Sequence, residues 1–187
     1  MLMLDCAEGT QMQLRKCRVR FTKLSHVFIT HLHGDHCFGL IGMISTFGLL
    51  GRTAKLHVHG PKELGPELER QLQFYTHDLG YEVVFYPVDT TKRAVVFEDR
   101  SITVESIPLI HRMPCCGYLI SEKPSQPHIR RDMMDAYQIP NSQVNNIKCG
   151  ADWTTPDGDV IPNSRLVLAA DPVRSYAYLS DTRYIPD

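Results

Sequence analysis

The sequence predicts one mixed α/β domain that is interrupted by an insertion, and three observations support this. Short apolar runs typical of strands recur along the chain, and segments with apolar residues at helical spacing lie among them. The length of 187 residues is typical of one domain that buries roughly 70% of its unfolded surface. From Glu122 to Arg165, prolines, amides and mixed charges replace most aliphatic residues. We therefore expect a domain built from residues 1–121 and 166–187, with an insertion at 122–165.

The expected elements mix strands and helices without strict alternation. A strand at Met1–Leu4 leads into a turn at Asp5–Gly9 and then a helix, for which Thr10 and Gln13 fit a capping box. The other expected helices are a buried one at 38–50, one that opens at Pro66 and is capped by Gly80, and a short one at 130–137. The other expected strands are 27–30, 55–59, 81–86, 94–97, 101–107 and 176–180, and a turn is expected at 154–159.

Composition excludes several classes of protein. The 20 basic and 21 acidic side chains nearly cancel, so any nucleic-acid partner has to be held by a local patch. No apolar run approaches the ~20 residues of a membrane span, and the short apolar start does not resemble a signal peptide. The six cysteines show no paired CxxC spacing and no secretory context. We expect a cytoplasmic protein with reduced thiols and no membrane partner.

The segment His31-Leu32-His33-Gly34-Asp35-His36 is the strongest chemical signal. Alternate side chains of an extended segment point to one side, so His31 and His33 can reach one metal ion. Gly34 then lets the backbone turn, and Asp35 and His36 can reach a second ion. Three imidazoles and a carboxylate suit zinc, with iron or manganese as alternatives. The other interpretation is a histidine-rich loop without function.

Two further ligands are expected at strand ends. His111 follows the expected strand at 101–107, and a two-metal site needs ligands from several loops. Asp181 follows the expected strand at 176–180, and a carboxylate can bridge two ions. His57 and His59 alternate on a strand without a nearby carboxylate, so we interpret them as side chains of the sheet face. Cys37, Cys115 and Cys116 are interpreted as small buried thiols, with substitution as ligands left open.

Two regions are candidates for phosphate contacts. From Arg15 to Lys23 there are five basic residues and no acidic one, which indicates either a solvated helix end or a phosphate-binding patch that includes Arg15, Lys16 and Arg18. The insertion is either a solvated excursion or an arm that contacts a large substrate. Its basic residues, among them Arg130, Arg131 and Lys148, are interleaved with acids.

These motifs resemble the ribonuclease Z family, zinc-dependent endonucleases of the metallo-β-lactamase fold that mature the 3′ end of transfer RNA. The segment 5–11 is similar to the family's sequence before its first helix, and His31-x-His33-x-Asp35-His36 is similar to its central motif. The surroundings of His111 and the segment Ser180-Asp181-Thr182 are similar to the next two motifs. The resemblance extends over nearly all of the chain, and the long insertion is similar to the family's flexible arm.

The resemblance implies a site and a function. His31, His33 and His111 would hold one zinc, Asp35 and His36 a second, and Asp181 would bridge them. It also implies an αββα sandwich that is incomplete here, because the family's chains continue beyond Asp187 with a further histidine ligand and a His-Glu motif. The expected activity is hydrolytic removal of the 3′ trailer from precursor transfer RNA, with Asp35 orienting the attacking hydroxide. The RNA-binding candidates are those named above, and a homodimer is expected.

Two other functions remain open. One keeps the fold and the metals but acts on a small phosphodiester, thioester or lactone, for which the insertion at 122–165 would be unnecessary. The other is a fragment or subunit that folds and has no turnover because a ligand is missing.

Overall fold

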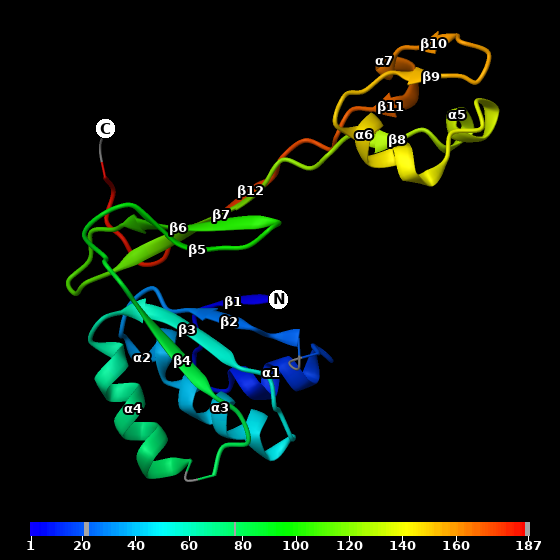
Figure 1. Ribbon diagram of the computed structural model, residues 1–187. Helices are drawn as coiled ribbons and strands as arrows, with labels where there is room; N and C mark the ends of the chain where they lie inside the picture. Colours follow the sequence, from blue (N-terminus) through cyan, green and yellow to red (C-terminus); the bar gives the residue numbers. More distant parts are fainter. Residues whose placement is uncertain (21–22, 77, 186–187) are drawn as a thin grey trace. The chain divides into compact units, whose positions relative to one another are not determined.

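The computed structural model, which describes residues 1–20, 23–76 and 78–185, divides into two compact units (Figure 1). Unit 1 comprises Met1–Glu98, Thr103–Ile120 and Tyr176–Asp187, and unit 2 comprises Asp99–Ile102 and Ser121–Ser175. None of the helices in the described ranges is long and apolar enough to cross a membrane.

The first sheet of unit 1 is parallel, with strand order β1-β2-β3-β4. Its strands are β1 (Leu2–Leu4), β2 (His26–Phe28), β3 (Leu56–Pro61) and β4 (Val83–Val88). The helices that connect them are α1 (Thr10–Lys16), α2 (Gly34–Cys37), α3 (Gly39–Leu49) and α4 (Leu64–Tyr75). In Figure 1 they lie below the sheet. Because all four strands run the same way, the loops after them meet at one edge, which we call the carboxyl edge.

The second sheet of unit 1 has strand order β12-β7-β6-β5. Its strands are β5 (Ala94–Glu98), β6 (Ile102–Pro108), β7 (Cys116–Glu122) and β12 (Ser175–Tyr178). β5 and β6 form an antiparallel pair with a register shift between Val95 and Phe97. Aromatic rings join the two sheets: the ring of Phe28 lies 5.2 Å from that of Tyr118 and 6.3 Å from that of Phe97. Unit 1 is therefore layered as helices, parallel sheet and second sheet.

Unit 2 has its own small core. Its elements are β8 (His128–Ile129), α5 (Arg131–Ala136), a 3₁₀ turn η2 (Asn141–Gln143), α6 (Val144–Lys148), β9 (Trp153–Thr154), β10 (Val160–Ile161), α7 (Asn163–Leu166) and β11 (Val167–Leu168). The buried side chains of its core are Met134, Ile139, Ile147, Ile161 and Leu166. β10 pairs with β9, and β11 pairs with β8.

Several local expectations differ from the structure. The expected capping box is wrong: Gly9 occupies the N-cap of α1 at φ 72°, and the Thr10 hydroxyl donates to the carbonyl of Ala7. α4 begins at Leu64 and ends at Tyr75, so Gly80 does not cap it. Pro66 is accommodated inside the first turn, where no intrahelical N–H partner is lost.

Other differences concern the second sheet and the insertion. β7 was not expected, because Cys116 and Gly117 hide its alternating pattern. Unit 2 extends to Ser175, past the Arg165 boundary indicated by composition, because Leu166 is buried in its core and Val167–Leu168 pairs with β8. The short helix and the turn expected at 130–137 and 154–159 are present as α5 and as the connection between β9 and β10.

Candidate metal centre

Three histidines and one aspartate converge at the carboxyl edge of unit 1. His31 and His33 follow β2, His111 follows β6, and Asp181 follows β12. One ligand atom from each lies within 4.8 Å of all the others. Residues that are 150 positions apart in the sequence thus meet because the ends of three strands meet.

The spacing of the donor atoms suits a metal ion. His33 Nδ1 lies 3.0 Å from His31 Nε2 and 3.3 Å from His111 Nε2. Imidazole nitrogens that bind one tetrahedral zinc at 2.0–2.1 Å would lie roughly 3.3 Å apart. Asp181 Oδ2 lies 3.9 Å from His31 Nε2 and 4.0 Å from His111 Nε2. The four residues therefore fit a single ion with three nitrogen donors and one oxygen donor.

Asp35 and His36 lie beside this group. His36 Nε2 is 3.6 Å from Asp35 Oδ2 and 4.0 Å from Asp181 Oδ2, the same oxygen that lies near His31 and His111. The Asp35 side chain is 75% exposed and remains accessible to solvent. Asp181 thus lies between the two groups, where a carboxylate can contact both ions of a two-metal site.

Asp5 orients the histidines and was not expected as a site residue. Its Oδ2 lies 2.7 Å from His36 Nδ1, which leaves His36 Nε2 facing Asp35 and Asp181. It also accepts hydrogen bonds from the Thr30 backbone and hydroxyl and from the Tyr178 hydroxyl. The Thr30 hydroxyl lies 3.0 Å from Nδ1 of His31. A carboxylate behind the ligand histidines fixes their tautomer and orientation. The signal in the sequence was its position directly after β1.

The charges around the site shift the pKa values of two histidines in opposite directions. Burial lowers the pKa of His31, which is fully buried, and neighbouring His36 and His33 lower it further. A lowered pKa keeps this imidazole neutral, the form that binds metals. Burial acts against the charged form of His36 as well, but the hydrogen bond and charge of Asp5, with Asp35, raise its pKa overall.

The loop after β1 holds the histidine motif in place. The backbone N–H of Cys6 donates to the carbonyl of His36, and Gly39 donates to the carbonyl of Cys6. A Cβ at Gly39 would lie 1.7 Å from the Ala7 carbonyl oxygen, so only glycine allows this close approach. The start of α3 is thereby joined to the loop that carries Asp5.

Other candidate ligands do not join this cluster, although the Cys37 and Cys115 thiols contact the backbone carbonyls of His33 and Asp181 at 3.3 and 3.6 Å. His57 and His59 are on the face of the first sheet that meets the second sheet, where the ring of His26 lies 4.6 Å and 5.4 Å from theirs. Burial raises the pKa values of the Cys37 and Cys116 thiols to about 11 and that of Cys115 to about 12. Cys115 and Cys116 are buried, as expected, whereas Cys37 is half-buried. Thiols whose pKa is raised in this way stay protonated.

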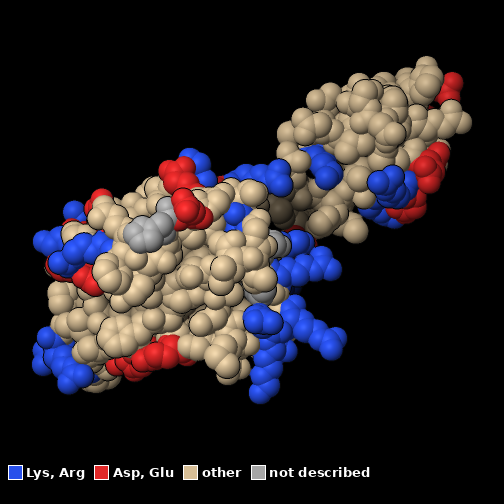
Figure 2. Space-filling model, turned by 90° about the horizontal axis from the view of Figure 1, so that it is seen from below, with Lys and Arg blue, Asp and Glu red and all other residues tan. Residues whose placement is uncertain are grey.

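The basic candidates for RNA contacts are dispersed. Arg15, Lys16 and Arg18 are exposed at the end of α1, and the chain from there enters β2 at the edge opposite the metal ligands. Lys and Arg side chains project from this end of unit 1 (Figure 2). In unit 2, Arg131 is exposed and Lys148 is half-buried. Arg130 Nη2 lies 2.6 Å from Asp132 Oδ2, so its charge is already paired.

Comparisons with known proteins match this chain to one family model and to relatives of another name. The family model described as anti-Pycsar protein Apyc1 matches residues 1–134. The chain is 57% identical over 187 residues to ribonuclease Z of Bacteroides fragilis, and 54% identical over 186 residues to ribonuclease Z of Phocaeicola vulgatus. These matches cover all of the chain and 62% and 60% of the relatives. The chain thus spans about three fifths of the length of these curated relatives.

Solved structures share the fold. The crystal structure of the short form of human tRNase Z matches with a TM-score of 0.56 at 31% identity, covering 64% of this chain and 52% of that one. A long-form RNase Z from yeast matches with a TM-score of 0.53 at 16% identity over 66% of this chain and 22% of that one, which supports the fold alone.

Proposed function

We propose that this chain, which belongs to the family described as anti-Pycsar protein Apyc1 and is 57% identical to a protein named ribonuclease Z, is part of a metal-dependent endoribonuclease. The whole protein would remove the 3′ trailer of precursor transfer RNA. The observation that carries the proposal is the cluster of His31, His33, His111 and Asp181, in a chain 57% identical to a protein named ribonuclease Z. The fold and the similarity to ribonuclease Z were both predicted from the sequence motifs.

The donor set favours two zinc ions. His31, His33 and His111 would hold one, Asp35 and His36 would contribute to the other, and Asp181 would contact both. Zinc bound there would lower the pKa of the attacking water and would place positive charge beside the phosphodiester. Imidazole nitrogens and carboxylate oxygens are ligands that zinc accepts readily.

The protein's own groups would orient the reaction. Asp35, exposed and beside His36, would accept the proton of the attacking water. Asp5 would hold His36 through Nδ1, and Thr30 would hold His31 in the same way. The leaving oxygen would be the 3′ oxygen of the transfer RNA or the 5′ oxygen of the trailer. By resemblance to the ribonuclease Z family we propose the former, which leaves a 3′-hydroxyl on the transfer RNA and a 5′-phosphate on the trailer.

Unit 2 would bind the body of the substrate. It has its own core, and Arg131 and Lys148 are among its cationic side chains that make no ion pair in the described part of the chain. Together with Arg15, Lys16 and Arg18 they would contact RNA phosphates, so binding should weaken as salt rises. We further propose that the protein works in the cytoplasm, with free cysteines, and forms a homodimer. Sedimentation at several concentrations tests the homodimer, and a monomer throughout would contradict it.

The central test is cleavage with mapped product ends. Precursor transfer RNA with a 3′ trailer would be incubated with zinc and either this chain or this chain joined to the remaining segment of the Bacteroides fragilis relative. We expect cleavage at the trailer junction by at least the joined protein, and its loss in Asp35→Ala. Asp78→Asn, an exposed aspartate beyond the end of α4, is the matched control and should retain activity. Cleavage that survives in Asp35→Ala would contradict the assigned role.

A second candidate is hydrolysis of a small phosphodiester, favoured by the match of residues 1–134 to a family described by another name, anti-Pycsar protein Apyc1. Removal of unit 2 discriminates the two. Ser121 and Ser175 are neighbours, with hydroxyl oxygens 3.0 Å apart, so a two-residue Asn-Gly turn can join them. Unchanged cleavage of precursor RNA by this deletion variant would favour the small substrate.

A further inference from the structure

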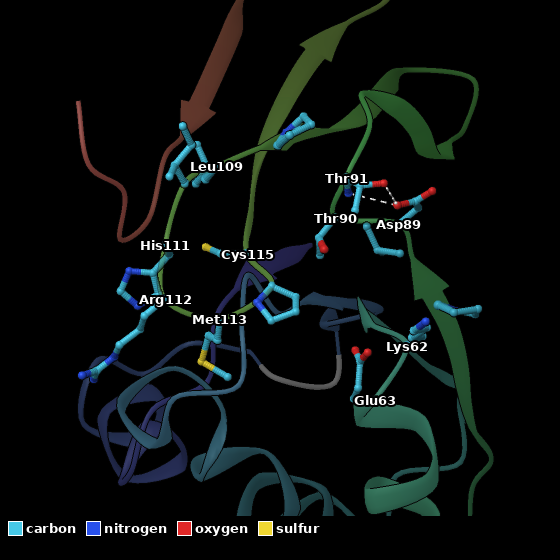
Figure 3. Close-up of a pocket in the computed structure, with 15 residues that line it drawn as sticks. Lys62, Glu63, Asp89, Thr90, Thr91, Leu109, His111, Arg112, Met113 and Cys115 are labelled. Atoms are coloured by element: carbon cyan, nitrogen blue, oxygen red, sulfur yellow. Dashed lines mark hydrogen bonds between the residues drawn. The ribbon is translucent and has the colours of Figure 1, made fainter. Parts of the chain in front are cut away.

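A cavity of about 1030 Å³ opens beside His111, entirely within unit 1. Three loops line it: one between β3 and α4, one after β4 and one between β6 and β7 (Figure 3). His111 is both a member of the metal cluster and a lining residue of the cavity. A substrate with its phosphate at the metal site would therefore extend directly into this space. The volume lies at the upper end of the range for pockets that enclose small organic ligands.

The two sides of the cavity differ in chemistry. One side is formed by the loop between β6 and β7, with Pro108, Met113 and Pro114 as apolar surface. The other carries Lys62, Glu63 and Thr90, which face this loop across the hollow in Figure 3. An apolar surface opposite charged and hydroxyl groups suits a ligand that has flat apolar faces and a polar edge.

The charged groups of the cavity are not equally available. Asp89 accepts hydrogen bonds from the backbone N–H and the hydroxyl of Thr91 at 2.9 and 2.6 Å and pairs with Lys92 at 3.2 Å. It is therefore occupied within its own turn. The side chains of Lys62 and Glu63 make no ion pair or hydrogen bond with the described residues, and both are exposed. Arg112 also lines the cavity, but its Nε lies 3.2 Å from His33 Nε2, so Lys62 and Glu63 are the charged side chains left for a ligand.

A nucleotide has matching parts. Its base can stack on or pack against apolar side chains, as bases do in single-stranded RNA complexes. Its phosphate is attracted to a lysine ammonium. The amino groups of bases and the hydroxyls of ribose donate hydrogen bonds, which a free carboxylate accepts.

On the basis of the nuclease function proposed above, we propose that this cavity, which we call the flanking-nucleotide pocket, binds one nucleotide adjacent to the cleaved phosphodiester. Lys62 binds the phosphate of that nucleotide, and Glu63 accepts hydrogen bonds from its base or sugar. The apolar side formed by Pro108, Met113 and Pro114 covers the base.

Binding of small ligands to the metal-free protein tests the pocket separately from catalysis. Cytidine 5′-monophosphate, cytidine and inorganic phosphate would be titrated in the presence of a chelator, with dissociation constants taken from backbone amide shifts of Thr90 and Met113. We expect cytidine monophosphate to bind more tightly than cytidine or phosphate. Equal affinity for phosphate and the nucleotide, or no binding of the nucleotide, would overturn the proposal.

Two substitutions separate the assigned roles. Lys62→Ala should weaken binding of the nucleotide about tenfold and leave cytidine unchanged, because only the phosphate contact is lost. Lys55→Ala is the matched control, because Lys55 directly precedes β3 whereas Lys62 directly follows it. The Lys55 ammonium pairs with Glu82 at 2.6 Å. Glu63→Gln should weaken nucleotide and nucleoside by the same factor, with Glu69→Gln on the exposed part of α4 as its control.

The outcomes distinguish this inference from the proposed function. If Lys62→Ala behaves like Lys55→Ala while precursor RNA is still cleaved, the pocket assignment is wrong and the nuclease function stands. If the nucleotide binds as expected while the joined protein does not cleave precursor RNA, the nuclease function fails and the pocket remains a nucleotide site.

Discussion

Acidification should weaken unit 1 through His59. This residue is 2% exposed, and its ring stacks between Phe28 at 4.4 Å and Tyr86 at 4.8 Å. Its Nε2 lies 3.1 Å from His26 Nδ1, and its Nδ1 has no hydrogen-bond partner among the described residues. Burial, together with neighbouring His26 and His57, lowers the pKa of His59 to about 3. The folded protein therefore keeps this imidazole neutral at pH values where the unfolded chain protonates it.

The sign and size of this pH effect follow from the difference between the pKa of His59 in the folded protein and in the unfolded chain. An unfolded histidine has a pKa near 6.5, so the stability contributed by neutral His59 is present above that pH and is lost as the pH falls toward 3. Each pH unit below 6.5 costs about 1.4 kcal/mol, which gives about 2 kcal/mol at pH 5. Urea unfolding followed by far-UV circular dichroism at pH 7.5 and pH 5 measures the change.

The variant His59→Phe keeps a stacked ring and removes the site that binds the proton. Its free energy of unfolding should fall by about 2 kcal/mol less than that of the wild type between the two pH values. His128→Asn is the control: the side chain of His128 is 53% exposed, and the variant should reproduce the wild-type pH dependence. An equal fall in His59→Phe and the wild type would refute the reasoning.

Three other predictions concern packing. Leu166→Ala should destabilise unit 2 by about 2–5 kcal/mol, because a fully buried side chain is removed from its core. The single tryptophan, Trp153, packs against that core, so its fluorescence should report an earlier urea transition in this variant. The urea transition of unit 1, followed by circular dichroism, should stay unchanged. If both transitions shift together, the two cores are not separate. Tyr118→Phe should lower the free energy of unfolding in urea by about 1 kcal/mol, since the buried Tyr118 hydroxyl donates to the Ile29 carbonyl at 2.8 Å. An unchanged free energy of unfolding would show that this hydrogen bond makes no net contribution. Gly39→Ala should lower the melting temperature strongly in a thermal scan, because its Cβ would overlap the Ala7 carbonyl. Gly80→Ala is the control and should cost less, because its Cβ would make only an ordinary contact of 3.5 Å with the Arg52 carbonyl.

The sequence predicted the elements that local patterns define. The strand before His31 and the buried helix of α3 were visible as apolar runs, and the motif at 31–36 indicated candidate metal ligands by type and spacing. The role of Asp5 was not visible, because it depends on β1 pairing with β2 and bringing a carboxylate to within 2.7 Å of His36. The pocket beside His111 was not predicted either, since its loops lie far apart in the sequence and meet only at the carboxyl edge.

The expectations about helix ends failed for a related reason. Thr10 and Gln13 have the spacing of a capping box, yet the tight approach of the Asp5–Gly9 loop to α3 places Gly9 at the N-cap instead. Tertiary contacts thus determined the geometry of α1, which short-range sequence rules cannot anticipate.

The hydrogen bond between Ser121 and Ser175 has a consequence for how such proteins diversify. Unit 2 leaves the sheet through β7 and returns through β12, which are neighbouring strands about 4.8 Å apart. Segments of different length and shape can be exchanged between these two points with little change in loop-closure entropy. Lineages can therefore acquire, enlarge or lose an insertion here without altering the strand ends that carry the candidate metal ligands.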